Sequence, residues 1–515
     1  MRTAMTGARA ITLLLGTGSL ASAQQILWHV EAAAPTDGMG RAVSVGPDVS
    51  GDGVADLLVG YVYELCGTNT SGVVREFSTS SGQINGWCGA TYAGNFGAPV
   101  GWLDDVDGRG APDVIVGETS FKDPFWGLGT GRFQVLAGED SSLLYEVVGT
   151  LQNGYFGYFA VCGDVDVDGL RDIIVGAPGY GGNAEGKVWL FSGVDGALIR
   201  EHVGPSSNMY LGMIVLGVGD TDGDGIDDYA MTAALGINKG RVDVRSGRTG
   251  SLIFRLDGKS GDNIGSHIAR TKDLDGDGRD DLLISRVASR DGKVEAYSPF
   301  TGALLWSVSG LSSIEYFGRP TLEVGDQNGD DVPDFLMSVI YDDHDDHDSG
   351  RVDLISGANL RRLYRFYPDA TKVRFFGETL ERGVDFNGDG IEDLIMGCAD
   401  GGSLSKDAGV LQIRAGNDLW LQADPIAPIV GDTVVVDLRG AMTGRLGLIA
   451  VTSIDGAPTF ESLLLAPFDA NGELQFSADI DASLSGMEFT LMGWAQNRNG
   501  RGRLLDATPF VVTVQ

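Results

Sequence analysis

Aspartates recur along this chain at a spacing suited to holding a metal ion. Seven copies of an acidic nine-residue loop lie about 56 residues apart, and they begin at Asp48, Asp105, Asp164, Asp220, Asp273, Asp326 and Asp385. The fifth copy reads D-x-D-x-D-G-x-x-D, and the apolar run Leu282-Leu283-Ile284 follows it directly. This pattern predicts a metal-binding loop that leads into a strand.

The loop spacing has a chemical reason. Side chains at positions 1, 3 and 5 of a tight loop point at one centre, and glycine at position 6 allows the sharp turn. Position 7 can add its carbonyl oxygen and position 9 a further carboxylate. Hard oxygen ligands in a flexible cage favour Ca²⁺ over Mg²⁺. An EF-hand would end in glutamate at position 12 and lie between helices, whereas here the ligand run stops at position 9 and β-rich sequence follows.

We therefore predict calcium sites in six of the loops. Their ligand positions are Asp48, Ser50, Asp52, Val54 and Asp56; Asp164, Asp166, Asp168, Leu170 and Asp172; Asp220, Asp222, Asp224, Ile226 and Asp228; Asp273, Asp275, Asp277, Arg279 and Asp281; Asp326, Asn328, Asp330, Val332 and Asp334; and Asp385, Asn387, Asp389, Ile391 and Asp393.

The second loop departs from the pattern. It holds Asp105, Asp107 and Asp113 but has Arg109 at position 5, so its guanidinium is expected to take the place of an ion. About six calcium ions per chain are then expected. Any single match could be an ordinary Asp/Asn/Gly turn without metal. Seven matches in register favour metal for the set.

Composition agrees with metal binding. The chain carries 71 acidic against 37 basic residues, a net charge of −34. This balance argues against nucleic acid as a partner, because phosphates need Lys and Arg to neutralise them.

The first 23 residues resemble a secretory signal peptide. Arg2 and Arg9 precede an apolar stretch, and Ala21-Ser22-Ala23 offers a small-residue cleavage site. The apolar stretch is too short to span a bilayer, and no other segment approaches about 18 consecutive apolar residues. We expect a secreted or cell-surface-associated protein without a membrane span. Extracellular calcium can fill loop sites of modest affinity, on the order of 10⁻⁴ to 10⁻³ M.

Four cysteines do not make a disulfide framework. Cys66 and Cys88 flank one hairpin region and could pair in an oxidising compartment. Cys162 and Cys398 are expected to be buried small apolar side chains.

The sequence around each loop defines a repeat unit of four short strands. An apolar residue and a glycine precede the loop; a strand ending near Gly176-Ala177-Pro178 follows it in the third repeat, and then come strands near 186–193 and 197–203. The apolar-Gly pairs are Phe96-Gly97, Phe156-Gly157, Leu211-Gly212, Ile264-Gly265, Phe317-Gly318 and Phe376-Gly377. Four strands per repeat, arranged radially, are typical of a β-propeller blade.

These FG and GAP elements around D-x-D-x-D-G-x-x-D loops resemble the FG-GAP repeats of the integrin alpha-subunit propeller over about residues 26–417. The resemblance implies a seven-bladed propeller with calcium loops on hairpins between the first and second strands of a blade. Acidic loops occur in all seven repeats here, more than the integrin pattern uses. No transmembrane helix or leg domains are seen, so an integrin's signalling role is not implied.

The predicted fold is therefore all-β, with a seven-bladed propeller at residues 24–417. The segment Ile26–Val30 resembles the fourth strands of the repeats and is expected to complete the last blade, which removes exposed edges. The competing candidate is Leu419–Leu421. The FG phenylalanines are expected to pack between blades. Residues 418–515 alternate with period 2 and predict a small C-terminal β-sandwich.

Catalytic motifs are missing from the sequence: we find no G-x-S-x-G, H-E-x-x-H or C-x-x-C pattern. His344 and His347 lie in an acidic run, Tyr341 to Asp348, between the second and third strands of the sixth repeat. They could form a second kind of metal site. A solvated acidic loop is the favoured interpretation, because charge runs usually repel.

Two classes of function remain. We expect a calcium-stabilised binding or adhesion module whose partner is an extracellular protein or glycan. We do not expect an enzyme. The alternative is a calcium-dependent polysaccharide-acting enzyme, such as a lyase, or a lectin. A convergent Lys/Arg/His/Tyr pocket on one face would separate them, and linear spacing shows none.

The FG and GAP segments share the face opposite the calcium loops. An aromatic-rich rim there is a plausible contact surface. Its expected exposed aromatics are Tyr92, Phe121, Trp126, Tyr180 and Tyr210.

Overall fold

Every regular element in the described part of the chain is a β-strand. The computed structural model describes residues 26–31, 38–66, 69–70, 72–89, 94–122, 129–234, 239–287, 292–310, 316–328, 330–342, 348–368, 374–387, 390–398, 410–414 and 416, and the strands of the C-terminal region given below. The proposed signal peptide, residues 1–23, lies outside this part. Among the described residues, no helix is long and apolar enough to cross a membrane.

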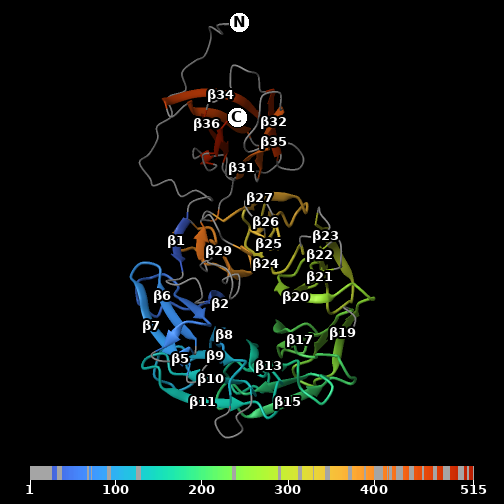
Figure 1. Ribbon diagram of the computed structural model, residues 1–515. Helices are drawn as coiled ribbons and strands as arrows, with labels where there is room; N and C mark the ends of the chain where they lie inside the picture. Colours follow the sequence, from blue (N-terminus) through green and yellow to red (C-terminus); the bar gives the residue numbers. More distant parts are fainter. Residues whose placement is uncertain are drawn as a thin grey trace, which may run out of the picture.

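Seven antiparallel four-stranded sheets form a ring of blades (Figure 1). This confirms the predicted seven-bladed propeller. Blades 1 to 3 consist of β2 (Met39–Val45), β3 (Leu57–Tyr61), β6 (Val73–Ser78) and β7 (Gly82–Cys88); β8 (Phe96–Trp102), β9 (Val114–Glu118), β10 (Arg132–Leu136) and β11 (Leu143–Val148); and β12 (Tyr158–Val161), β13 (Ile173–Ala177), β14 (Lys187–Phe191) and β15 (Leu198–Val203).

The next three blades repeat this order. They consist of β16 (Val215–Gly219), β17 (Asp228–Ala233), β18 (Arg241–Arg245) and β19 (Leu252–Asp257); β20 (Ile264–Thr271), β21 (Asp281–Val287), β22 (Gly292–Tyr297) and β23 (Leu304–Ser309); and β24 (Thr321–Val324), β25 (Asp334–Val339), β26 (Arg351–Ile355) and β27 (Arg362–Phe366).

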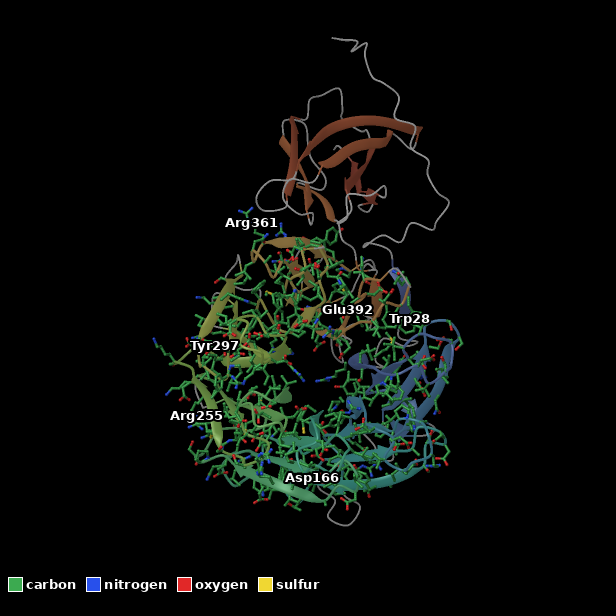
Figure 2. All side chains as sticks on the ribbon, turned by 180° about the vertical axis from the view of Figure 1, so that it is seen from behind. Trp28, Asp166, Arg255, Tyr297, Arg361 and Glu392 are labelled. Atoms are coloured by element: carbon green, nitrogen blue, oxygen red, sulfur yellow. A yellow bond between two sulfur atoms is a disulfide. The ribbon has the colours of Figure 1, made fainter. Side chains whose placement is uncertain are left out.

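Blade 7 is closed by the N-terminal strand, as predicted. Its sheet runs β1-β30-β29-β28, so β1 (Ile26–Glu31) lies outside β30 (Val410–Arg414), β29 (Leu394–Cys398) and β28 (Thr379–Arg382). Trp28, at the outer rim in Figure 2, packs edge-on against Phe77 of blade 1 at a centroid distance of 5.4 Å. This closure joins the two ends of the ring and leaves no open blade edge at the seam.

The FG residues are buried between blades, which confirms the packing prediction. Phe156 at the start of blade 3 stacks on Phe133 of blade 2 at 6.0 Å. The backbone of each FG segment also lies against the preceding blade: Gly186 in blade 3 forms a parallel bridge with Leu211 in blade 4. A Cβ on Gly186 would stand 2.1 Å from the Leu211 nitrogen, so only glycine fits there.

The ring has two chemically different faces. The acidic loops connect the first strand of each blade to the second, and we call their side the loop face. The first strands begin, and the second strands end, at the opposite side, which we call the FG face. The short hairpin β4 (Leu65–Cys66) and β5 (Asn69–Thr70) lies between the second and third strands of blade 1, and so belongs to the FG face.

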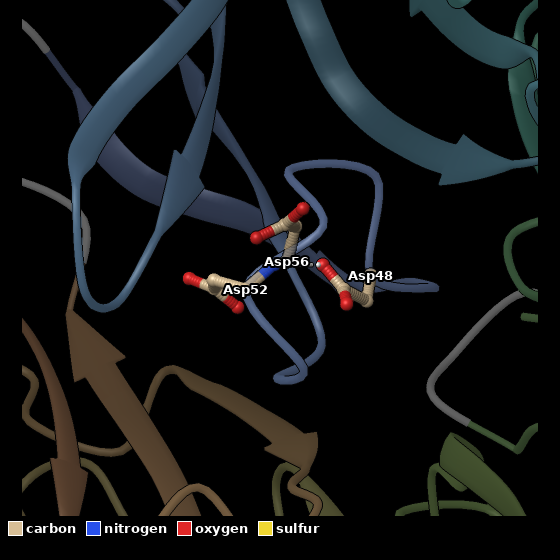
Figure 3. Close-up of side chains that lie close together, drawn as sticks. All are labelled: Asp48, Asp52 and Asp56. Carbon is tan, nitrogen blue, oxygen red and sulfur yellow. Dashed lines mark hydrogen bonds between the residues drawn. The ribbon is translucent and has the colours of Figure 1, made fainter.

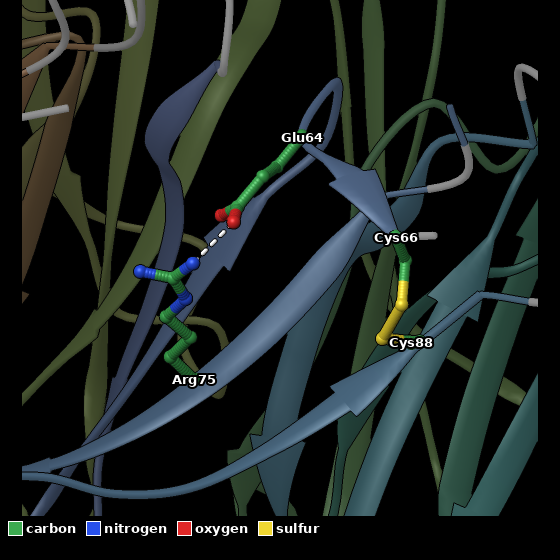
Figure 4. The surroundings of a disulfide bond; sticks show 4 residues. All are labelled: Glu64, Cys66, Arg75 and Cys88. Carbon is green, nitrogen blue, oxygen red and sulfur yellow. Dashed lines mark hydrogen bonds and ion pairs between the residues drawn. A yellow bond between two sulfur atoms is a disulfide. The ribbon is translucent and has the colours of Figure 1, made fainter. Parts of the chain in front are cut away.

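Cys66 and Cys88 form a disulfide that ties this hairpin to β7, with a Cα–Cα distance of 6.0 Å (Figure 4). Glu64 beside it pairs with Arg75. Cys162 and Cys398, which are both described, take no part in a disulfide and are buried, as expected for small apolar side chains.

The C-terminal strands form two sheets, separate from the ring in Figure 1. This agrees with the predicted sandwich, while the boundary at residue 418 stays a prediction. One sheet contains β31 (Trp420–Asp424), β32 (Thr433–Arg439) and β35 (Glu473–Asp479); the other contains β34 (Ala457–Pro467), β33 (Leu446–Ile454), β36 (Glu488–Gln496), β37 (Leu504–Asp506) and β38 (Phe510–Thr513). The competing closure strand near residue 420 therefore pairs here, with β32, and not with blade 7.

Candidate functional site

Each acidic loop joins the first and second strands of its blade, where the resemblance placed it. In the first five loops, carboxylate oxygens from three aspartates come within 4.8 Å of one another. Figure 3 shows this convergence for Asp48, Asp52 and Asp56. The other groups are Asp105, Asp107 and Asp113; Asp164, Asp166 and Asp172; Asp220, Asp222 and Asp228; and Asp273, Asp275 and Asp281.

The position-1 aspartate shapes the loop backbone. In the first loop, Asp48 Oδ1 accepts hydrogen bonds from the N–H groups of Gly51 at 2.7 Å and Asp52 at 3.1 Å. The Oδ2 atom accepts one from the position-6 N–H of Gly53 at 2.7 Å. This last bond recurs in all seven loops at 2.7 to 2.8 Å. The turn is therefore formed by the protein's own hydrogen bonds.

The position-9 aspartate anchors the loop to its blade. It is buried in all seven loops, and its Oδ2 accepts the position-2 N–H at 2.7 to 2.9 Å. In five blades its Oδ1 also accepts an N–H from a glycine just after the third strand, as Asp172 does from Gly193 at 3.1 Å. Sequence reasoning assigned this residue only as a ligand. The recurring glycine after the third strand was the missed signal.

Burial makes two of the anchor aspartates weaker acids than usual. It raises the pKa of Asp281 to about 7 and that of Asp172 to about 6, because the charged form loses solvation. The exposed position-5 residue Asp52 behaves oppositely: hydrogen bonds from Ser78 and Ser80 lower its pKa to about 2. Each loop of this kind therefore combines a buried anchor with more exposed carboxylates.

Residues at positions 3 and 7 also fit the loop pattern. Ser50 stands at position 3 of the first loop, and its hydroxyl lies 3.3 Å from both Asp48 Oδ1 and Asp56 Oδ1. At position 7, the N–H groups of Val54, Leu170, Ile226, Arg279 and Val332 each donate to the position-5 carboxylate at 2.9 to 3.0 Å.

The second loop holds a guanidinium among its carboxylates. The backbone N–H of Arg109 donates to Asp105 and Asp107, each at 3.0 Å. The backbone N–H at position 5 makes the same pair of hydrogen bonds in the fourth loop. The Arg109 guanidinium contacts Asp107 at 2.5 Å and reaches Asp140 at 2.9 Å. The hydrogen bond from Arg109 lowers the pKa of Asp107. The loop keeps the metal-loop backbone while a side chain supplies the positive charge.

The sixth and seventh loops share this geometry where they are described. Gln327 N–H donates to Asp334 at 2.9 Å, and Asp330 N–H donates to Asp326 at 3.1 Å and to Asn328 at 3.0 Å. Asn387 donates to Asp393 at 3.3 Å. Asp389 lies outside the described residues. All-oxygen donor sets without histidine or cysteine fit a hard cation such as Ca²⁺.

The expected aromatic rim differs from the observed one. Phe121 is 5 % exposed and lies under the Arg132 guanidinium, 3.9 Å from its ring centroid, so its predicted exposure is wrong. Tyr180 is half-buried against Trp189, with ring centroids 5.5 Å apart. Tyr210 is exposed as expected. Tyr92 and Trp126 lie outside the described residues.

The residue just before each FG pair adopts a left-handed conformation in all seven blades. Gly38, Asn95 and Asn263 tolerate it readily, whereas the other blades place aromatic residues there: Tyr155, Tyr210, Tyr316 and Phe375, with φ of 51° to 58°. Such a backbone costs about 1 to 2 kcal/mol for an ordinary L-residue. The three tyrosines are 37 % to 48 % exposed, so burial does not offset this cost. Strain retained at exposed positions points to function.

A pocket of about 600 Å³ lies on the propeller axis at the FG face, and we call it the axial pocket. All seven blades line it, through residues that follow the FG pairs and lie in the first strand or just before it. They include Arg41, Pro99, Tyr158, Met213, His267, Arg319 and Glu378. A second pocket of about 460 Å³ shares Tyr158, Met213 and Arg319 with it and extends past Tyr155 and Tyr210.

Basic and neutral donors gather in the axial pocket although the chain is strongly acidic. Arg41 and Arg319 are exposed there, and Arg41 donates to the Tyr63 hydroxyl at 3.0 Å. Burial, helped by the charge of Arg319, lowers the pKa of His267 to about 4, so its ring is neutral. Its Nδ1 accepts the Thr321 N–H at 3.4 Å, which leaves Nε2 to carry the proton.

The convergent Arg/His/Tyr set is the feature that linear spacing did not show. Arg41, Tyr158, His267 and Arg319 come from four separate blades, so no local motif marks them. The common signal is positional: each follows an FG pair by one or two residues.

Residues 156–191 match the family model described as "FG-GAP repeat". The chain carries an FG-GAP repeat. The match covers blade 3 from Phe156 through its acidic loop to Phe191 at the end of β14. In this FG-GAP unit the FG pair, the loop and the GAP segment are the elements whose geometry recurs around the ring.

The chain is also similar to integrin alpha subunits. It is 28 % identical to "Integrin alpha-4" of Xenopus laevis over 239 residues, covering 42 % of this chain and 23 % of that protein. It is 30 % identical to "Integrin alpha pat-2" of Caenorhabditis briggsae over 234 residues, or 38 % of this chain and 18 % of that protein. The chain thus spans less than a quarter of the length of these relatives. A solved structure, "Structure of Dos1 propeller", aligns with 81 % of this chain and 93 % of its own at 8 % identity and a TM-score of 0.42.

His344 and His347, the candidate second metal site, lie outside the described residues. In the sequence they lie between β25 and β26. This site stays a prediction.

Proposed function

We propose that this chain is a secreted, integrin-alpha-like binding module whose FG face engages an extracellular protein or glycan while calcium holds the loop face. The similarity to integrin alpha subunits supports an adhesive or binding role. The observation that carries the proposal is that the two faces of the ring hold different chemical groups. Convergent carboxylates occupy one face, and pockets with strained, exposed tyrosines occupy the other.

Calcium acts here on stability. The clustered carboxylates repel one another without an ion, so an ion that binds only the folded state stabilises it by mass action. At a free concentration one hundred times Kd, each site contributes about 2.7 kcal/mol. The ligand positions are those given above, with six ions per chain and the second loop ion-free. Residues 1–23 are removed on export, the propeller occupies 24–417, and 418–515 form a separate sandwich.

The calcium claim is tested by melting the protein in excess calcium and in chelator, with metal content measured in each sample. We expect a markedly lower melting temperature in chelator. An unchanged melting curve for protein confirmed to be calcium-free would contradict the claim.

The binding claim is tested on a glycan and extracellular-protein array, probed with and without calcium. We expect a ligand that is retained only by the calcium-loaded protein. The paired variant Tyr155→Asn and Tyr210→Asn should lose that ligand while keeping its calcium content. A ligand that binds equally well in chelator would remove calcium from the proposal.

A second candidate function is a calcium-dependent enzyme or lectin for acidic polysaccharides. The axial pocket favours it specifically, because Arg, His and Tyr side chains converge there. Incubation of the purified protein with acidic polysaccharides separates the two. Chain cleavage that is lost in a His267→Ala variant would establish the enzyme, and unchanged chain length leaves the binding module.

A further inference from the structure

We propose that the axial pocket binds a carboxylate-bearing saccharide. Arg41 and Arg319 hold the acidic group, and the sugar rings lie against tyrosines at the pocket's edge. This inference rests on the proposed binding role of the FG face and names its ligand class.

The charge of the pocket selects an anion. Arg41 and Arg319 both line it, in a chain whose net charge is −34. No ion pair of Arg319 occurs within the described residues, and Arg41 spends one N–H on the neutral Tyr63 hydroxyl. Glu378 is the acidic side chain among the lining residues. Guanidinium groups bind carboxylates through paired hydrogen bonds, and low-dielectric walls strengthen the attraction.

Neutral donors surround these charges. His267 is neutral with Nε2 protonated, so it donates without adding positive charge. Tyr158 adds a hydroxyl group to the lining. The hydroxyls of Thr379 and Ser266 donate to the carbonyl oxygens of Gly40 and Ser285, so they can accept hydrogen bonds from a ligand. A saccharide presents many hydroxyl groups that can pair with these polar side chains. A ligand with only a carboxylate would leave the side chains without a partner.

The pocket edge supplies flat apolar surface of the kind that sugar rings cover. Tyr155, Tyr158 and Tyr210 are 48 %, 40 % and 37 % exposed, and all three line the second pocket that opens from the axial one. Tyrosine offers an apolar ring face together with a hydroxyl. Met213 and Ile214 line both pockets between these tyrosines and the axis. The combined space suits an oligosaccharide better than a single sugar.

Because the tyrosines adopt a left-handed conformation, their contribution to ligand binding can be tested with a substitution that does not destabilise the fold. The same backbone position holds Asn95 and Asn263 in blades 2 and 5, with φ of 58° and 46°. Asparagine tolerates this conformation, so it can replace tyrosine without added strain. A residue kept only for the fold would be better as asparagine.

The experiment measures binding of a tetragalacturonate to the full calcium-loaded chain by calorimetry. Its methyl ester and a short glutamate peptide serve as comparison ligands. We expect the acid to bind, the ester to bind at least tenfold more weakly, and the peptide to bind more weakly than the acid. Arg41→Gln and Arg319→Gln should each weaken binding about tenfold or more, because each removes a charge-assisted contact.

Two further variants test the tyrosines and the background charge. Tyr155→Asn combined with Tyr210→Asn should weaken binding while leaving the melting temperature unchanged or raised. Lys259→Gln, which neutralises an exposed lysine in the turn before blade 5, should change neither. A variant that fails to fold is revealed by its melting curve, and the comparison of acid with ester on the unaltered chain still decides the question.

Equal affinity for acid and ester, no effect of the two arginine substitutions, or tighter binding of the glutamate peptide would each overturn the inference. The proposed function would survive if an array ligand still bound the FG face of the Arg41→Gln, Arg319→Gln variant. Conversely, tetragalacturonate binding without any array ligand would support the pocket alone.

Discussion

Val167 gives the sharpest test of how the acidic loops are built. It occupies position 4 of the third loop with φ of 66° and is 67 % exposed. The same position is Gly51, Gly108 and Gly276 in three other loops, where an added Cβ would meet nothing within 4 Å. The penalty at Val167 is therefore backbone strain and not a steric clash, and a β-branched residue suffers it most.

We predict that Val167→Gly stabilises the protein. Relief of the left-handed conformation returns about 1 to 2 kcal/mol. The greater freedom of glycine in the unfolded chain costs about 0.4 to 1 kcal/mol. The exposed side chain adds little, so the expected net gain is about 0.5 to 1 kcal/mol, or roughly 1 to 2 °C in melting temperature for a chain of this size.

The assay is thermal and urea unfolding in saturating calcium. Val167→Ala is the matched control: it keeps the Cβ, so it should recover less than half of the gain. Gly276→Val in the fifth loop should lose stability. A Val167→Gly variant no more stable than the original chain, together with a tolerated Gly276→Val, would refute the reasoning.

Three further predictions concern charged groups. Arg109→Asp completes the second loop and should raise the bound calcium by one ion per chain in metal analysis, whereas Arg109→Gln should not; the idea fails if the original chain already binds an ion there. Asp172→Asn should lower the free energy of unfolding by about 1 to 3 kcal/mol even in chelator, because an anchoring hydrogen-bond acceptor is lost. Asp166→Asn, at an exposed ligand position, should lower it only when calcium is present. Equal stability of these two variants in chelator would argue against an anchoring role for Asp172. Burial raises the pKa of Glu76 to about 7 from 4.5, so the folded protein binds its proton more tightly and stability falls as pH rises from about 4.5 to 7. Glu76→Gln should therefore add about 2 kcal/mol at pH 8 and almost nothing at pH 4.5, and a pH-independent difference would contradict this.

The sequence predicted the parts of the structure that repeat. The loop spacing, the FG pairs and the alternating strands recur with one period, and each is a local pattern with one stable geometry. The outer strand of blade 7 followed as well, because Ile26–Val30 has the pattern of a fourth strand and otherwise lacks a partner. The predicted packing between blades held for all six FG pairs named from the sequence, since a large apolar side chain at a blade edge has only the neighbouring blade to pack on.

Side-chain exposure could not be predicted in the same way. Phe121 and Tyr155 are both aromatic residues on FG-face segments. Phe121 is covered by Arg132 from the adjacent strand, whereas Tyr155 is turned out by its left-handed backbone. Neither fact is visible in linear spacing, because each depends on a contact or conformation set by the assembled blade.

By itself, the sequence determined which residues form each loop and blade, because carboxylate spacing, glycine positions and strand alternation act within a few residues. Only the tertiary structure decided what the ring encloses. Arg41, His267 and Arg319 are separated by most of the propeller sequence, and closure of seven blades around one axis brings them to a single pocket. The tertiary structure likewise gave the position-9 aspartates, which are candidate ligands, a second role as buried anchors. Their additional hydrogen-bond partners lie across the blade, on the turn after the third strand.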